Sequence, residues 1–153
     1  MPILLVRHAD AGSRSAWEGP DRDRPLSPAG RAQARSLAAN LEKHALKRLL
    51  SSPYARCIQT FEPLGAAVGL QVEPVAALGE GRAYEALELV RRLAGSSVAL
   101  CTHGDVIPEL LQALVAEDGL DLGPYPRQAK ASVWILETAG DRFISASYME
   151  APR

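Results

Sequence analysis

The sequence predicts an α/β fold with a mostly parallel sheet and helices on both of its faces. Two unbroken apolar runs, residues 3–6 and 98–101, are typical of strands buried on both sides. Segments with apolar residues spaced three and four apart, which is typical of amphipathic helices, alternate with short apolar runs. This alternation is the pattern of parallel α/β sheets.

The chain has 153 residues and a formal net charge of −1, and we expect one domain spanning residues 1–153. A near-neutral charge does not favour a nucleic-acid binder or a polybasic membrane patch. No apolar run approaches the roughly 20 residues that span a bilayer, and the first strand follows Met1 so closely that no signal peptide fits, so we expect a cytoplasmic protein. Cys57 and Cys101 are expected to be buried, reduced thiols.

The first half of the chain predicts two strand–helix units. After the first strand, the polar stretch 11–24 is interpreted either as a solvated loop or as a loop with one arginine lining a site. Ser27 and Pro28 predict a helix start, followed by an apolar stripe at Ala34, Leu37, Ala38, Leu41 and Ala45. A second strand at 47–51 leads to a second helix start.

That second helix is expected to be capped by Ser52 and to begin at Pro53, which puts Arg56 in its first turn. Pro63 is expected to kink or restart it. A short strand at 71–74, a loop at 76–82 with Glu80 between two glycines, and a helix around 86–93 follow.

The last third predicts the strand at 98–102, a helix capped by Asp105, and two strands at 132–136 and 142–146 joined by a tight turn. The carboxyl ends of parallel strands form the crevice where ligands bind in open α/β sheets. Three such ends carry Arg7-His8, residues 52–56 and residues 102–104. We therefore expect two arginines and two histidines to converge there.

Such a group of residues suits phosphoryl transfer without a metal. The planar donor fork of arginine matches phosphate oxygens, and histidine acts as nucleophile or acid/base near neutral pH. Competing chemistries lack their motifs: there is no G-x-x-x-x-G-K-[ST], no GxGxxG and no H-E-x-x-H. Pro63 and Ile107 lie six residues after the two cysteines, where the loop of a cysteine phosphatase has arginine. Asp21 and Asp23 could bind magnesium, but they also fit a charged loop.

Four segments resemble the histidine phosphatase (phosphoglycerate-mutase-like) superfamily: LVRHA at 5–9, RPLSPAG at 24–30, SSPYARCIQT at 51–60 and THG at 102–104. The pattern is similar to short bacterial phosphohistidine phosphatases and to phosphatase domains linked to Nudix hydrolases. The resemblance implies a three-layer α/β/α sandwich with a mostly parallel central sheet, and no metal or other cofactor.

The resemblance also implies roles for individual residues. His8 would be phosphorylated and then hydrolysed, Arg7 and Arg56 would hold the phosphate, and His103 would contact the transferring group. Gly104 would lie among the substrate-binding residues.

Three further positions carry weaker implications. Glu80, in an L-x-E segment, resembles the family's proposed general acid, and Arg24 would either border the pocket or anchor the loop. The family commonly has glycine where this chain has Ala9, and alanine would be unwelcome if that position needs a positive φ.

We interpret the chain as a phosphatase that acts through a phosphohistidine intermediate. The expected substrate is a phosphohistidine protein or another accessible phosphorylated group, because little polypeptide between residues 60 and 85 is left to roof the crevice. The alternatives are a small-molecule or nucleotide phosphomonoesterase, a phosphoglycerate-type mutase and a non-catalytic phosphate-binding module. The pocket is expected to be shallow and open, with four possible cations at its rim: Arg14, Arg82, Arg127 and Lys130.

Overall fold

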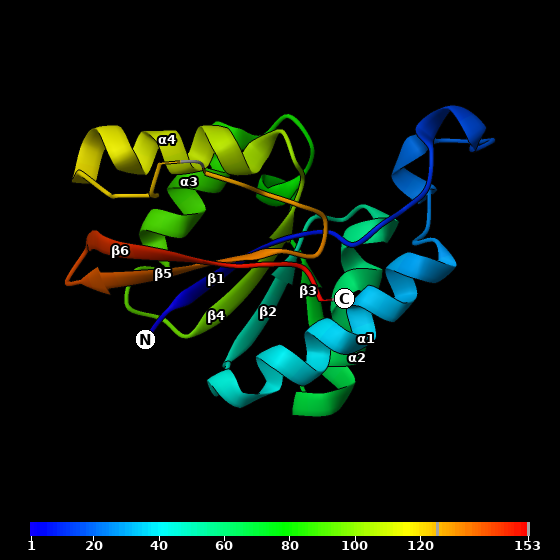
Figure 1. Ribbon diagram of the computed structural model, residues 1–153, viewed down its shortest axis with the longest axis horizontal. Coiled ribbons are helices and arrows are strands. Elements are labelled where there is room, and N and C mark those ends of the chain that lie inside the picture. The colour runs from blue at the N-terminus through cyan, green and yellow to red at the C-terminus, as the bar shows by residue number, and fades with distance from the viewer. Residues whose placement is uncertain (125, 153) are drawn as a thin grey trace.

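The computed structural model describes residues 1–124 and 126–152 and contains one six-stranded sheet (Figure 1). The strand order is β3-β2-β4-β1-β5-β6. The strands are β1 Ile3–Arg7, β2 Arg48–Ser51, β3 Val72–Pro74, β4 Val98–Thr102, β5 Val133–Ala139 and β6 Arg142–Met149. Strands β1 to β4 run parallel, whereas β5 and β6 are antiparallel to their neighbours. The prediction of a mostly parallel sheet is confirmed.

Helices cover both faces of this sheet (Figure 1). Helices α1 Pro28–Leu41 and α2 Ala55–Val68 lie on one face, and α3 Ala83–Arg92 and α4 Val106–Asp118 on the other. The side chains of β1 alternate between the two cores, as the two-residue period of a strand requires. Leu4 and Val6 pack with α1 and α2, while Ile3 and Leu5 pack with α3 and α4. The three-layer α/β/α sandwich is thereby confirmed.

The sheet register brings the ends of three strands to one level. Arg7, the last residue of β1, pairs with Thr102, the last residue of β4. Ser51, the last residue of β2, pairs with Cys101. The residues that follow these strands therefore emerge side by side at one edge of the sheet, as the parallel arrangement predicts.

Helix α1 begins as its sequence predicts. The Ser27 hydroxyl accepts a hydrogen bond from the Gly30 N–H at 3.0 Å, and Pro28 is the first helical residue. A Cβ on Gly30 would overlap the carbonyl oxygen of Asp10, so this glycine lets the helix pack on the chain that leaves β1. The expected stripe is buried as far as Leu41, but Ala45 is exposed because the helix has already ended.

One predicted cap is wrong, and a second occupies its predicted position without its cap hydrogen bond. Helix α2 begins at Ala55 rather than Pro53, and Ser52 contacts His103 instead of capping it. The carboxylate of Asp105 accepts a hydrogen bond from the N–H of Gly81 and makes no cap bond in α4. Both side chains thus contact a residue distant in sequence, and the Ser52 hydroxyl also accepts from the N–H of Tyr54 at 3.2 Å. Helix α2 is also assigned as continuous through Pro63, so no restart occurs there.

Both cysteines are buried free thiols, as expected. Within residues 1–124 and 126–152, no helix is long and apolar enough to cross a membrane.

Candidate active site

His8 follows β1 and is almost completely buried, with 6% of its surface exposed. Its Nδ1 lies 2.8 Å from the carbonyl oxygen of Ala9, which can only accept, so Nδ1 carries the proton. Burial lowers the pKa of His8 to about 3, and the nearby cationic side chains of Arg56 and Arg7 act in the same direction. The ring is therefore neutral near pH 7, with an unprotonated Nε2 available as a nucleophile.

Ala9 fits its position without strain. Its backbone is not in the left-handed region, so the expectation that alanine replaces a positive-φ glycine does not apply. Its N–H donates to the hydroxyl of Thr60 at 2.9 Å, which holds the chain beside His8 against helix α2.

Arg7 reaches the same edge from the last position of β1. Its Nη1 donates to the carbonyl oxygen of Gln128 at 3.0 Å, and burial lowers the pKa of its guanidinium. The guanidinium lies against Gly104, where a Cβ would be 2.7 Å from the Arg7 Cζ.

Arg56 is the second residue of α2 and is 2% exposed. Its Nη1 donates to the carbonyl oxygen of Asp21 at 2.9 Å. Its Nη2 donates to two carboxylates, at 3.1 Å to Asp21 and at 2.9 Å to Glu80. The guanidinium is thus held by negative groups that an anionic substrate would have to displace or share.

His103 follows β4 and is 2% exposed. Its Nε2 lies 2.8 Å from the hydroxyl of Ser52, and its ring meets the Tyr54 ring edge-on with centroids 4.6 Å apart. The rings of His103 and His8 have centroids 5.5 Å apart. The two histidines predicted from separate strand ends are therefore neighbours.

Three buried nitrogen atoms of this site have no hydrogen-bond partner among the described residues: Arg7 Nε, Arg56 Nε and His103 Nδ1. A buried polar group without a partner costs about 1–3 kcal/mol, so such groups rarely stay unsatisfied without a reason. A tetrahedral oxyanion offers several acceptors and negative charge to donors of this kind. The arrangement fits a phosphoryl group in front of His8.

Glu80 is placed at this site by the loop before α3. Its two carboxylate oxygens accept from Arg14 at 2.8 Å and from Arg56 at 2.9 Å. Burial by itself raises the pKa of Glu80, but the charges and hydrogen bonds of these arginines outweigh it, so the pKa lies below its ordinary value. Glu80 is therefore ionised in this state.

Sequence reasoning missed the contact of Asp21 with Arg56, because Asp21 was interpreted as part of a charged loop or as a possible magnesium ligand. Its carboxylate contacts Arg56, and also Arg14 at 3.2 Å and Arg24 at 2.9 Å. No local spacing signals these contacts, since Asp21 and Arg56 are 35 residues apart.

Arg24 anchors the loop. It is 8% exposed, and its side chain donates to the carboxylate of Asp21 and to the carbonyl oxygen of Ala11 at 2.7 Å. Of the two interpretations left open by the sequence, these contacts support loop anchoring.

The expectation of a shallow, open pocket is wrong for this state of the molecule. The side chains of His8, Arg56 and His103 are buried. The ion pairs of Glu80 with Arg14 and Arg56 connect the loop that carries Arg14, the loop that carries Glu80 and helix α2. Three of the four expected rim cations are paired with carboxylates: Arg14 with Glu80, Arg127 with Glu150 and Lys130 with Asp10.

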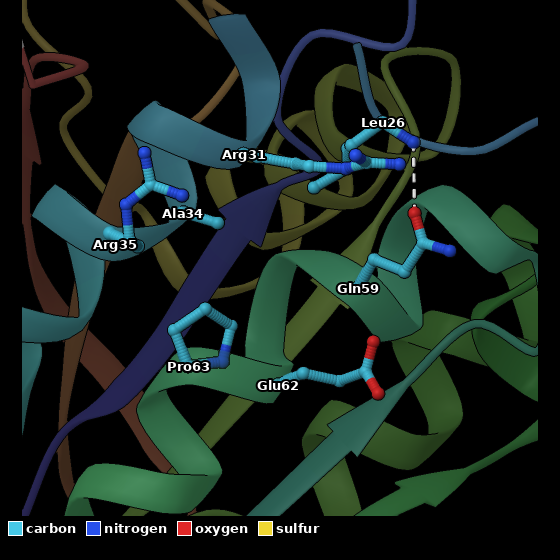
Figure 2. A pocket seen from close by; sticks show the side chains of 7 residues that line it. All are labelled: Leu26, Arg31, Ala34, Arg35, Gln59, Glu62 and Pro63. Atoms are coloured by element: carbon cyan, nitrogen blue, oxygen red, sulfur yellow. Dashed lines mark hydrogen bonds between the residues drawn. The ribbon is translucent and has the colours of Figure 1, made fainter. Parts of the chain in front are cut away.

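A separate hollow of about 430 Å³ lies between α1 and α2 (Figure 2). Its lining contains none of the predicted catalytic residues. At one side of it the Gln59 Oε1 accepts a hydrogen bond from the N–H of Leu26 at 2.9 Å (Figure 2). Gln59 lies about one turn beyond Arg56, so this bond ties the chain that follows Arg24 to the helix that carries Arg56.

Within the described part of the chain, no three His, Cys, Asp or Glu side chains come together as metal ligands. The cationic side chains that act on His8 are those of Arg7 and Arg56, which suit an anion.

The chain belongs to the histidine phosphatase superfamily (branch 1), whose family model matches residues 3–86. It is 34% identical to an 8-oxo-(d)GTP phosphatase of Mycolicibacterium smegmatis over 98% of its own length, and it spans 48% of the length of that relative. A putative phosphohistidine phosphatase, SixA of Agrobacterium tumefaciens, is 26% identical with a TM-score of 0.74, and the match covers 97% of each chain. A mycobacterial glucosyl-3-phosphoglycerate phosphatase solved with VO3 shares the fold, at 20% identity, a TM-score of 0.76 and 99% coverage of each chain.

Proposed function

We propose that the chain is a metal-independent phosphatase that forms a phosphohistidine intermediate at Nε2 of His8. One observation carries the proposal: His8 is neutral and buried, its Nδ1–H is bound to the carbonyl oxygen of Ala9, and cationic and N–H donors surround it. A histidine nucleophile needs this tautomer and this oxyanion-binding environment.

In the first step the Nε2 lone pair attacks phosphorus, and the bond from phosphorus to the leaving group breaks. The leaving group takes a proton from Glu80. In the second step water attacks phosphorus, the P–N bond breaks, and the water proton passes to Glu80. Inorganic phosphate leaves, and both His8 and Glu80 return to their starting states.

The first step requires protonated Glu80, whereas Glu80 is ionised beside Arg14 and Arg56. A phosphate dianion bound to Arg56 competes for the guanidinium and adds negative charge near the carboxylate. Both effects raise the pKa of Glu80. Substrate binding would thereby prepare the acid that the first step uses.

We expect entry of the substrate to displace the side chain of Arg14 from Glu80. The side chain of Arg14 is 61% exposed in its pair with Glu80, and ion pairs this exposed contribute little to stability. Displacement of the Arg14 side chain from Glu80 therefore costs little. The connection between β3 and α3, residues 75–82, is short, so it offers no extended lid of the kind that a mutase needs to exclude water.

We infer a phosphohistidine-bearing protein or peptide as the substrate, with cytoplasmic location as the matching expectation. The similarity to the putative phosphohistidine phosphatase of Agrobacterium tumefaciens supports this choice. The second candidate is a nucleotide, and its support is the 34% identity to the 8-oxo-(d)GTP phosphatase.

Two experiments test the proposal. Labelled substrate and rapid denaturation should trap an acid-labile, base-stable phosphoenzyme in the wild type and none in His8→Ala. Steady-state kinetics on a phosphohistidine peptide, a nucleoside phosphate and a sugar phosphate should rank the peptide first. A lead of about 100-fold in kcat/KM for the sugar phosphate, about 2.7 kcal/mol in barrier, would reject the inferred substrate class. A phosphoenzyme that persists in His8→Ala would reject His8 as the nucleophile.

A further inference from the structure

Ser52 has no assigned role in the reaction, although it lies fully buried at the centre of the site. It follows β2 directly, and its N–H donates to the carbonyl oxygen of Cys101 at 2.9 Å. Its hydroxyl oxygen lies 2.8 Å from Nε2 of His103. The backbone is therefore held by the neighbouring strand while the side chain contacts the second histidine.

The surroundings of this hydroxyl indicate where its proton lies. The N–H of Tyr54 is 3.2 Å from the Ser52 Oγ and can only donate to it. The Ser52 proton is then free to point at Nε2 of His103. A neutral imidazole that accepts at Nε2 carries its own proton on Nδ1.

Because Nε2 contacts Ser52, Nδ1 is the ring nitrogen left to contact a phosphoryl group. It is buried and has no partner among the residues that the structure describes. The edge-on contact with Tyr54 and the contact with the His8 ring restrict rotation of the His103 ring. In this orientation a proton on Nδ1 makes a donor beside the nucleophile, whereas the other tautomer would turn a lone pair toward phosphate oxygens.

We propose that Ser52 is a positioning residue that donates to Nε2 of His103 and so keeps the proton on Nδ1, where it binds the transferring phosphoryl group. The role of His103 in binding the phosphoryl group rests on the proposed phosphatase function. The tautomer of His103 is independent of that function. The effect of a wrong tautomer can be large: in the Ser-His-Asp triad it lowers kcat by about 10⁴.

Nuclear magnetic resonance of protein labelled with ¹⁵N-histidine tests the tautomer directly. The chain has three histidines, so His103 can be assigned by comparison with His8→Ala and His44→Gln. Near pH 7.5 the wild type should show His103 protonated at Nδ1 and unprotonated at Nε2. Ser52→Ala should shift His103 toward the form protonated at Nε2. A wild-type His103 protonated at Nε2 alone would overturn the proposal, even if the variant fails to fold.

Kinetics give the second measurement. Ser52→Ala should lower kcat on an aryl phosphate by about tenfold, which is less than the 10²–10³ expected for complete loss of a donor. Ser51→Ala is the matched control, because this adjacent buried hydroxyl donates to the Ser52 carbonyl oxygen and makes no hydrogen bond to His103. It should leave both the tautomer and kcat close to those of the wild type.

The possible outcomes separate the two proposals. In one outcome the wild type has no phosphatase activity, but His103 shows the expected tautomer and loses it in Ser52→Ala. This outcome would reject the proposed function and keep the role of Ser52 in positioning. An active enzyme whose His103 tautomer and kcat are the same in Ser52→Ala would reject the role of Ser52 alone.

Discussion

The guanidinium of Arg7 lies so close to the backbone of Gly104 that a Cβ on this glycine would come within 2.7–2.9 Å of three guanidinium atoms. The neighbouring strands β1 and β4 end at the same level and place the two residues together. Absence of a side chain at position 104 is therefore a condition for the position of Arg7. We therefore expect Gly104, which was predicted to bind substrate, to act through the position of Arg7.

Gly104→Ala should lower kcat/KM substantially while the melting temperature changes little. The added methyl group displaces the end of a flexible side chain rather than backbone, so the fold can absorb it, but Arg7 leaves its position beside His8. Loss of a donor of this type costs about 10²–10³ in rate. Kinetics on an aryl phosphate and thermal unfolding of the same preparation measure the two effects. Unchanged kinetics would show that Arg7 works from a displaced position.

Arg56→Lys should not restore activity although it keeps the charge. Lysine lacks the planar fork that reaches two oxygens at once, so we expect a loss of about 10²–10³ in kcat/KM. Arg31→Lys, at an exposed position on α1, is the matched control and should behave as the wild type. Equal turnover in Arg56→Lys and the control would show that Arg56 is a helix residue that pairs with Asp21 and Glu80 and has no role in turnover.

Glu80→Gln should slow alkyl phosphates far more than aryl phosphates. An alkoxide needs a proton as it leaves, whereas an aryl oxide is already a good leaving group. We expect a decrease of at least about 10² in kcat for the alkyl ester. Parallel measurements on the two esters decide the matter, and equal slowing of both would remove the assignment of Glu80 as general acid.

Asp21→Asn should strengthen binding of phosphate-like anions. The Asp21 carboxylate occupies the guanidinium of Arg56, and the substitution removes its charge but keeps an oxygen that can accept from Arg24. Loss of about 1 kcal/mol of competition corresponds to roughly fivefold tighter vanadate binding. Asp23→Asn, an exposed neighbour, is the control. Weaker binding in Asp21→Asn alone would mean that Asp21 supports the anion site.

His8 should make folding stability depend on pH below neutrality. Its pKa is about 3 in the folded protein, against about 6.5 in an unfolded chain, so only the unfolded state takes up the proton as pH falls from about 6.5 toward 3. Between pH 7.5 and pH 5.5 this should lower the free energy of unfolding by about 1 kcal/mol. Urea unfolding at the two pH values measures this change, and the decrease in unfolding free energy should be larger by this amount in the wild type than in His8→Gln. The same pH dependence in both would contradict the neutral, buried state of His8.

The sequence by itself determined the order of elements and the edge at which the site forms. Short apolar runs and the three- and four-residue spacing of the helices are local patterns, so they could be interpreted without knowledge of distant contacts. The carboxyl ends of parallel strands lie at one edge of a sheet, and this rule predicts that Arg7, His8, Arg56 and His103 lie together. Their catalytic roles stay predictions.

Only the tertiary structure decided which partners the buried polar groups have. Ser52 and Asp105 both looked like helix caps, yet they contact His103 and Gly81, which are 51 and 24 residues away. Asp21 looked like part of a solvated loop and instead contacts Arg56. A buried polar group must find a hydrogen-bond partner, and which group lies within reach depends on the packing of distant segments rather than on local spacing. The cover over the crevice and the tautomer proposed for His103 follow from such contacts.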